Sequence, residues 1–169
     1  MATLNDLIGI LKIRVIKGTN LIAKDINHSD PYVIISMGSQ KLKTRHVKND
    51  CNPVWNDELT LAIADFDAPI NLTVYDTDSF TPDDQLGEAQ IDIKPYIECM
   101  RAQLSDISTD TIVDKILPNR KNCLTDVSHI IWKDGKLVQD MIVRLKNVKT
   151  GEVELQIEWV DIPSYKNGS

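Results

Sequence analysis

The strongest constraint on the fold is a series of short apolar runs, most of which alternate hydrophobic with polar residues. The runs begin about ten residues apart, and turn residues such as glycine, proline and asparagine separate them. They occupy residues 10–16, 32–37, 40–47, 59–63, 70–74 and 86–93. A period of two is the pattern of a strand with one buried face. Many short strands at this spacing are typical of an antiparallel β-sandwich, so we expect an all-β fold.

The alternation breaks down over residues 94–139, and this segment predicts an insert between the sixth and seventh strands of the sandwich. Pro95 precedes a short run that predicts one helix, because proline is favoured in a first turn. Asp134 and Gly135 stand between two apolar runs and predict a β-hairpin. We further expect a weak strand at 112–117 and two last strands at 141–145 and 153–159, all within a single domain of residues 1–169.

Composition and targeting signals narrow the class of protein. The chain has no apolar stretch of about 18 residues or more, so we expect no membrane span. Its first residues lack a basic segment and a glycine at position 2, which predicts neither a secretory signal nor myristoylation. A net charge of −6 disfavours nucleic acid as a partner. The three cysteines lack the spacing of a zinc site, so we expect free thiols in a reducing compartment.

Two acidic stretches follow predicted strands and concentrate carboxylates in loops. The first runs from Asp25 to Asp30, and the second from Asp76 to Asp84. Like charges held this close repel one another unless a cation lies among them. Calcium is the expected cation, because it takes six to eight oxygen ligands from carboxylates, carbonyls and water. The alternative is a pair of solvated acidic loops that bind no metal.

Two other metal motifs fail at specific positions. An EF-hand loop that began at Asp76 would require glycine at its sixth place and glutamate at its twelfth. Thr81 and Gly87 occupy those places. A phosphatase of the haloacid dehalogenase type also uses Asp-x-Asp after a strand, but it requires threonine or valine where Phe80 stands. It also requires an alternating α/β chain, which the pattern of this sequence does not predict.

Four motifs in order along residues 9–93 resemble the C2 domain, a calcium- and phospholipid-binding β-sandwich. They are Asp25 with Ser29-Asp30-Pro31-Tyr32-Val33, then Asn52-Pro53-Val54-Trp55-Asn56, then Val74-Tyr75-Asp76-Thr77-Asp78, and last Asp84 with Leu86-Gly87. The resemblance implies an eight-stranded antiparallel sandwich. Because the chain begins with the strand that leads into the first acidic stretch, it is similar to the circularly permuted type II topology of the family.

The chain as a whole is similar to the small plant C2-domain abscisic-acid-related proteins. The matching segments are 37–45, 57–61, 91–95, 122–124 and 151–159, together with the long insert. This resemblance implies calcium-dependent docking on the plasma membrane and recruitment of PYR/PYL-type abscisic acid receptors. It also implies positive regulation of abscisic acid signalling and presence in the cytoplasm and nucleus. Some members of the family are described as GTPase activators.

The resemblance also assigns the calcium ligands. They are the carboxylates of Asp25, Asp30, Asp76, Asp78 and Asp84, with main-chain carbonyls near Lys24 and Thr77. All five carboxylate positions are aspartate. Five carboxylates carry a charge of about −5 and two calcium ions carry about +4, so we expect two ions.

Three features predict contact with an anionic phospholipid membrane. The first is calcium itself, whose open coordination positions can take lipid phosphate oxygens. Ile26 and Phe80 at the loop tips can enter the headgroup layer, although each could instead pack against its own loop. Lys41, Lys43 and Arg45 lie at a period of two on one strand face, which resembles the lysine-rich strand of other C2 domains. At about 1 kcal/mol each, these three cations are too weak to hold the protein on a membrane, so calcium is expected to be the switch.

The sequence favours a binding protein over an enzyme, because no candidate nucleophile has a convincing base. The main hypothesis is a calcium-dependent membrane adaptor in which the insert contributes to a partner surface. The alternative is a regulator of a GTPase, which a GTP-turnover assay would distinguish. Such a regulator presents an arginine, and Arg101 and Arg120 are the arginines of the insert.

Overall fold

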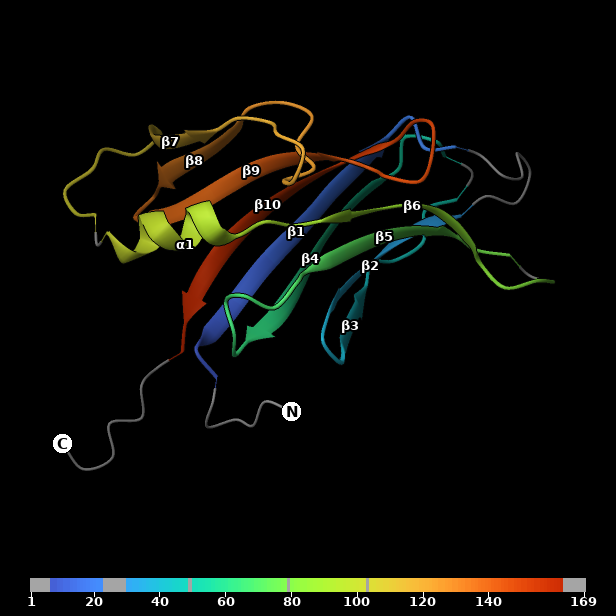
Figure 1. The fold of residues 1–169 in the computed structure, drawn as a ribbon, viewed down its shortest axis with the longest axis horizontal. Helices are drawn as coiled ribbons and strands as arrows, with labels where there is room; N and C mark the ends of the chain where they lie inside the picture. The colour runs from blue at the N-terminus through green and yellow to red at the C-terminus, as the bar shows by residue number, and fades with distance from the viewer. Residues whose placement is uncertain (1–6, 23–29, 49, 79, 103, 163–169) are drawn as a thin grey trace.

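The fold is seen in a computed structural model that describes residues 7–22, 30–48, 50–78, 80–102 and 104–162. These residues form strands packed in two antiparallel sheets, with one helix against them (Figure 1). The elements in chain order are β1 (Gly9–Thr19), β2 (Pro31–Met37), β3 (Gln40–Lys43), β4 (Val54–Ile63), β5 (Asn71–Asp76), β6 (Asp84–Gln90), α1 (Lys94–Arg101), β7 (Thr111–Ile116), β8 (Ser128–Lys133), β9 (Lys136–Arg144) and β10 (Glu152–Asp161).

The two sheets have different sizes. One has six strands in the order β4-β1-β10-β9-β8-β7, and the other has four in the order β3-β2-β5-β6. Eight of the strands make a sandwich of two four-stranded sheets, while β7 and β8 from the insert extend the larger one. The predicted C2-type sandwich, with a short helix and a hairpin in its insert, is therefore confirmed.

The pairing of strand β1 places the start of β1 and the end of β10 at the same end of the sandwich. The strand pairs antiparallel with both β10 and β4, and Gly9 lies opposite Asp161. The chain therefore enters and leaves the sandwich at one end, as Figure 1 shows. Thr19, at the other end of β1, lies opposite Glu152. The buried residues of β1 come from alternate positions and are Leu11, Ile13 and Val15, as its period of two predicts.

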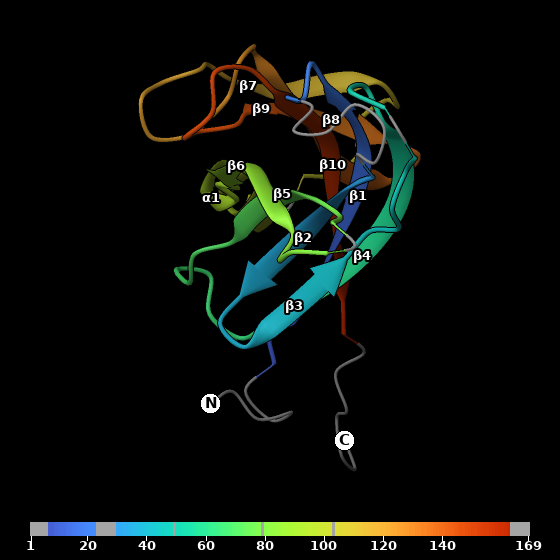
Figure 2. The same cartoon turned by 90° about the vertical axis from the view of Figure 1, so that its right-hand side faces the viewer.

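Side-chain and main-chain contacts close both sides of the sandwich. On one side, Gln40 of β3 donates from Nε2 to the Ala62 carbonyl at 2.8 Å and accepts from the Ala62 N–H at 2.9 Å. Figure 2 shows β3 and β4 side by side there. On the other side, Glu88 of β6 and Lys146 exchange main-chain hydrogen bonds of 3.3 and 2.7 Å. Both edges of the smaller sheet are thereby tied to the larger one.

Two strand boundaries differ from the expected ones. The second arm of the predicted hairpin and the strand expected at 141–145 are one continuous strand, β9, so the predicted end of the insert at Gln139 lies inside it. Gln139 can occupy an inward position because its amide donates to the Ser128 hydroxyl at 2.9 Å. Strand β3 ends at Lys43 rather than at position 47. Thr44 is buried, and its hydroxyl accepts the Val33 N–H at 2.9 Å.

Helix α1 is fixed to the larger sheet by the buried phenol of Tyr96. The Tyr96 hydroxyl donates to the Leu137 carbonyl at 2.6 Å and accepts the Trp159 N–H at 2.8 Å. This one group therefore joins the helix to β9 and β10. Burial raises the pKa of Tyr96 to about 12, although the hydrogen bond from the Trp159 N–H opposes the shift.

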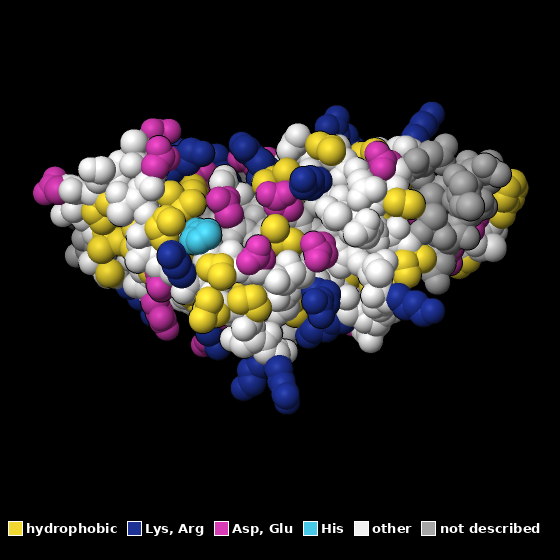
Figure 3. Space-filling model, turned by 90° about the horizontal axis from the view of Figure 1, so that it is seen from above, with side chains coloured by type: hydrophobic (Ala, Val, Ile, Leu, Met, Phe, Trp, Pro, Cys, Tyr) yellow, Lys and Arg dark blue, Asp and Glu magenta, His cyan; other side chains and the backbone are white. Residues whose placement is uncertain are grey.

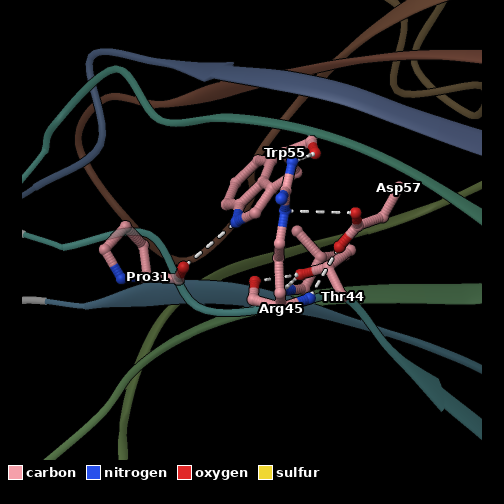
Figure 4. A network of polar contacts seen from close by, with 6 residues as sticks. Pro31, Thr44, Arg45, Trp55 and Asp57 are labelled. Carbon is pink, nitrogen blue, oxygen red and sulfur yellow. Dashed lines mark hydrogen bonds and ion pairs between the residues drawn. The ribbon is translucent and has the colours of Figure 1, made fainter.

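A network around Trp55 joins the two sheets at the end where β2 begins and β5 ends (Figure 4). The Trp55 ring is fully buried, and its Nε1–H donates to the Pro31 carbonyl at 3.0 Å. The Arg45 guanidinium donates to the Trp55 carbonyl at 2.7 Å and pairs with Asp57 at 3.3 Å. The Asp57 carboxylate also accepts the Arg45 N–H at 2.7 Å. The start of β2 is thereby held against β4.

Replacing Trp55 with phenylalanine should lower the free energy of unfolding by about 2 kcal/mol or more. The buried Pro31 carbonyl would lose its donor, and the smaller ring would leave a void. Urea denaturation monitored by circular dichroism measures the change. Trp132→Phe is the matched control, because the Trp132 side chain is half-buried on β8. Equal losses in the two variants would contradict the role given to the Trp55–Pro31 hydrogen bond.

Tyr96 should make the protein lose stability in alkali. Because folding raises the pKa of this phenol from 10.0 to about 12, its contribution is complete below pH 10 and is lost as the pH rises toward about 12. Tyr96→Phe should remove this pH-dependent part, at a cost of about 1–3 kcal/mol at neutral pH from the two orphaned backbone groups. Urea titrations at a neutral and an alkaline pH test this. The same alkaline loss in both proteins would contradict the prediction.

Candidate metal and membrane site

The second acidic stretch begins at the last residue of β5. Asp76 lies opposite Pro31 of β2 on one side and opposite Asp84 of β6 on the other. The three strands therefore bring Asp30, Asp76 and Asp84 to the same end of the smaller sheet. This is the end that the Trp55–Pro31 hydrogen bond holds to the larger sheet.

Asp76 is a buried carboxylate, with 2% of its surface exposed. Its Oδ1 accepts the Asp30 N–H at 2.8 Å. The Asp30 carbonyl in turn accepts from the Thr77 N–H at 3.3 Å and from the Thr77 hydroxyl at 3.1 Å. The main chain at Asp30 is thus held from both sides by the end of β5. A charge buried this deeply is costly unless hydrogen bonds or a cation stabilise it.

The turn after Asp76 is organised by two further carboxylates. Asp78 Oδ1 accepts the Phe80 N–H at 2.9 Å and the Thr81 N–H at 3.3 Å. Asp83 Oδ1 accepts the Asp78 N–H at 3.1 Å. Phe80 follows at the tip, and 96% of its surface is exposed. The turn therefore presents an apolar ring to solvent.

Tyr32 connects this turn to the smaller sheet, a role that the sequence reasoning missed. Its hydroxyl donates to Asp83 Oδ2, and its ring stacks on His46 at a centroid distance of 4.4 Å. The Lys43 ammonium lies 5.8 Å from the centroid of the same ring. The position of Tyr32 next to Asp30 and Pro31 was visible as part of a motif. Its contact with Asp83 joins residues 51 positions apart and gives no local signal.

These contacts shift two pKa values in opposite directions. The hydrogen bond from Tyr32, and then the one from the Asp78 N–H, hold the pKa of the Asp83 carboxyl below its usual range. Burial raises the pKa of the Tyr32 phenol, and the hydrogen bond to Asp83 raises it further. Tyr32 therefore stays protonated and keeps donating while Asp83 stays ionised. The predicted ligands did not include Asp83, whose two oxygens both accept hydrogen bonds from the protein.

The structure brings part of the predicted ligand set together. Asp30, Asp76, Asp78 and Asp84 lie at one end, and Asp84 is exposed there as the first residue of β6. Asp25, the carbonyl near Lys24 and the tip residue Ile26 lie outside the described residues. Within the ranges described, no group of three or more His, Cys, Asp or Glu side chains is placed to hold a metal ion.

The chemistry of the described donors nevertheless fits calcium. The donors are carboxylate, carbonyl and hydroxyl oxygens, which calcium prefers. No sulfur ligand accompanies them, and the nearby His46 Nδ1 forms a 2.9 Å hydrogen bond with the Thr77 hydroxyl. The Thr77 carbonyl remains a predicted ligand. Asp25 of the first acidic stretch, outside the described residues, also remains a predicted ligand.

The basic residues predicted to contact lipid divide into two kinds. Lys41 and Lys43 are both exposed on β3 and share one face of the strand. Arg45 lies beyond the end of β3, where its guanidinium is held by Asp57 and the Trp55 carbonyl. About two thirds of the Arg45 side chain, 66%, is still exposed. No helix in the described part of the chain is long and apolar enough to cross a membrane.

Solved structures with this fold include C2 domains of extended synaptotagmins. The calcium-bound C2A- and C2B-domains of Extended-Synaptotagmin 2 match with a TM-score of 0.61 and 23% identity. The match covers 92% of this chain and 46% of that one, so this chain spans under half of the two-domain fragment. The C2A domain of plant Extended Synaptotagmin 1 matches with a TM-score of 0.60 and 16% identity, over 93% of this chain and 98% of that one.

A family model and sequence comparisons over nearly the full length show which family the chain belongs to. A family model described as "C2 domain" matches residues 9–108. The Arabidopsis thaliana protein C2-DOMAIN ABA-RELATED 4 is 50% identical over 96% of this chain and 92% of its own length. GTPase activating protein 1 of Oryza sativa subsp. indica is 49% identical over 96% of this chain and 98% of its own length. The chain belongs to the C2-domain family and, within it, to the C2-domain ABA-related proteins.

Proposed function

We propose that this protein is a non-enzymatic, calcium-dependent adaptor that docks on anionic membrane and recruits abscisic acid receptors of the PYR/PYL type. The observation that carries the proposal is the buried Asp76 carboxylate, held against the Asp30 main chain at the end of the sandwich. The names of its relatives support a role in abscisic acid signalling. The adaptor would act at the plasma membrane and exchange with the cytoplasm and nucleus.

The residues at this end have distinct tasks in the proposal. The five predicted aspartates and the carbonyls near Lys24 and Thr77 would hold two calcium ions. Calcium bound there supplies open coordination positions for lipid phosphate oxygens. Asp83 and Tyr32 hold the turn that carries Asp78, because Asp83 accepts from both the Asp78 N–H and the Tyr32 hydroxyl. This bracing pre-organises the loop before any ligand binds.

Membrane contact outside the ion site would come from one apolar and two basic side chains. Phe80, exposed at the turn, is suited to enter the headgroup layer. Lys41 and Lys43 add about 1 kcal/mol each near an anionic surface. That sum is too small to overcome the repulsion between lipid phosphates and acidic loops that hold no cation. Lys41 and Lys43 of β3 would therefore strengthen docking on the membrane, but calcium would be required to trigger it.

The insert is proposed to provide the partner surface. Figure 3 shows hydrophobic side chains gathered over the end of the molecule where β7 and β8 lie. Ile112 of β7 is 46% exposed, and Leu117 just after it is 66% exposed. Large apolar side chains grouped at a surface are typical of sites that bind other proteins.

Regulation of a GTPase is the second candidate, favoured by the name of the rice relative. Of the two arginines in the insert, Arg101 lies with its guanidinium carbon 5.0 Å from the centroid of the Phe66 ring. Arg120 is exposed in the β7–β8 connection and is the better placed to reach a partner's nucleotide. Acceleration of GTP turnover that is lost in Arg120→Ala would favour this candidate.

Asp76→Asn should abolish calcium-dependent binding to vesicles that contain phosphatidylserine. Asparagine keeps the carbonyl oxygen that accepts the Asp30 N–H, so the fold should survive while one ligand charge is removed. Calcium affinity depends on ligand charge, so we expect the calcium affinity to fall about tenfold or more. Sedimentation with vesicles, in calcium and in chelator, measures the effect.

The matched control is Asp67→Asn, an exposed aspartate in the turn between β4 and β5 at the opposite end of the sandwich. It should bind vesicles as the wild type does. Binding of the wild type that is equal with calcium and with chelator would refute the switch.

Ile112→Ser combined with Leu117→Ser should weaken capture of abscisic acid receptors while calcium-dependent vesicle binding stays normal. Both side chains are exposed, so the core should not change. Pull-down with purified receptors and vesicle sedimentation provide the two readouts. Ile8→Ser with Val54→Ser removes two comparably exposed apolar side chains outside the insert and serves as the control. Receptor capture that is unchanged in the insert variant would place the partner surface elsewhere.

A further inference from the structure

A cavity of about 470 Å³ lies where the connection between β7 and β8 folds beside the end of β9. In Figure 1 this connection runs next to β9, away from the turn between β5 and β6. Arg120, Arg144 and Lys146 line the cavity, and Pro118 and Leu124 give it apolar walls. No carboxylate belongs to the lining. The cavity is therefore a pocket with a positive rim and an apolar interior.

The wall that carries Arg120 is held rigidly by two asparagines. Asn122 is 5% exposed. Its Oδ1 accepts the N–H groups of Asn119 and Leu124 at 3.0 and 3.1 Å, and its Nδ2 donates to the Leu117 carbonyl at 2.9 Å. Asn119 Oδ1 accepts the Lys121 N–H at 2.7 Å. These bonds fix the backbone on both sides of Arg120.

The opposite wall belongs to the sandwich itself. The Arg144 N–H donates to the Cys123 carbonyl at 2.7 Å, which joins the connection to β9. Two residues later, Lys146 is bridged to Glu88 of β6 through its main chain. Arg144 and Lys146 are both exposed and both line the cavity. The three cationic side chains thus emerge from backbone that tertiary contacts hold in place.

In the part of the chain that the structure describes, the ion pairs involve other cations than Arg120, Arg144 and Lys146. Glu88 is close to Lys146, but its carboxylate accepts from the Asn147 and Gln85 amides at 2.7 and 3.2 Å. Converging cations without counter-charges focus a positive potential that favours an anionic ligand.

We propose that this pocket binds phosphate monoester groups carried on a small ring, such as a phosphorylated inositol. Arginine recognises phosphate through paired hydrogen bonds, and the apolar walls suit the carbon face of a ring. The volume lies within the range of about 300–1,000 Å³ that is usual for ligand pockets. The group could belong to a phosphoinositide headgroup or to a soluble inositol phosphate.

The pocket is separate from β3, the strand that was predicted to contact lipid. β3, which carries Lys41 and Lys43, is one edge of the smaller sheet, and β6, beside the pocket, is the other edge. The pocket also does not include the predicted calcium ligands, so its binding is independent of the calcium-dependent membrane docking proposed above. Chelator removes calcium, so a failure of phosphate binding in chelator would count against the pocket and not against calcium-dependent docking.

The test uses the full chain in chelator, with soluble inositol trisphosphate as the probe. Binding is followed by amide shifts in nuclear magnetic resonance and by calorimetry. We expect shifts at residues 118–125 and 144–146. Arg144→Gln with Lys146→Gln should weaken binding about tenfold or more, since a hydrogen bond to a charged group contributes about that factor. Arg120→Gln, on the other wall, is a second variant that leaves β9 unchanged.

Lys94→Gln with Lys115→Gln removes the same charge from exposed positions elsewhere in the insert and is the control. Vesicles with phosphatidylinositol bisphosphate, also in chelator, form the second arm. A loss specific to the pocket variants with the soluble probe supports a soluble ligand, and a loss seen only with vesicles supports a lipid headgroup. Absence of shifts at the pocket, or equal losses in pocket and control variants in both arms, would overturn the proposal.

Discussion

The hydrogen bond from the buried Trp55 indole to the Pro31 carbonyl is the contact on which the functional end of the molecule depends. It crosses from β4 in the larger sheet to the first residue of β2 in the smaller one. The residue before Pro31 is Asp30, whose N–H donates to the Asp76 carboxylate. Sheet packing and the geometry of the acidic site are therefore linked through two adjacent residues, Asp30 and Pro31. Arg45 strengthens the link, because its guanidinium donates to the Trp55 carbonyl and pairs with Asp57.

Much of the fold follows from local patterns in the sequence. A period of two placed Leu11, Ile13 and Val15 in the core, and Pro95 marked the start of α1. The merging of two predicted strands into β9 could not be foreseen. Gln139 reads as a break in an apolar pattern, but it faces inward, where its amide nitrogen bonds Ser128, eleven residues away, while its Oε1 is buried without a partner among the described residues. Such a partner is visible only after the chain has folded.

The candidate site was predictable to a similar extent and for similar reasons. Aspartates at fixed spacing identified the acidic stretches, and strands β2 and β5 do bring Asp30 and Asp76 together. The roles of Asp83 and Tyr32 depend on a contact across the smaller sheet. Arg45 looked equivalent to Lys41 and Lys43 by spacing, but the buried Thr44 ends the strand before it. Likewise, Arg120, Arg144 and Lys146 are scattered in sequence and meet only through the connection beside β9.

The way the sandwich is closed has a consequence for encounters between copies of the chain. An open strand edge offers unpaired N–H and C=O groups and invites another chain to add a strand. Here the Gln40 side chain joins the edges of β3 and β4 at Ala62, and the Lys146 bridge covers the edge of β6 at Glu88. The remaining edge, β7, is interrupted by a bulge between Ile112 and Asp114 and carries the charged side chain of Lys115. Crowding of many copies on one surface should therefore not lead to continuous intermolecular sheets, and any association must be built from side chains.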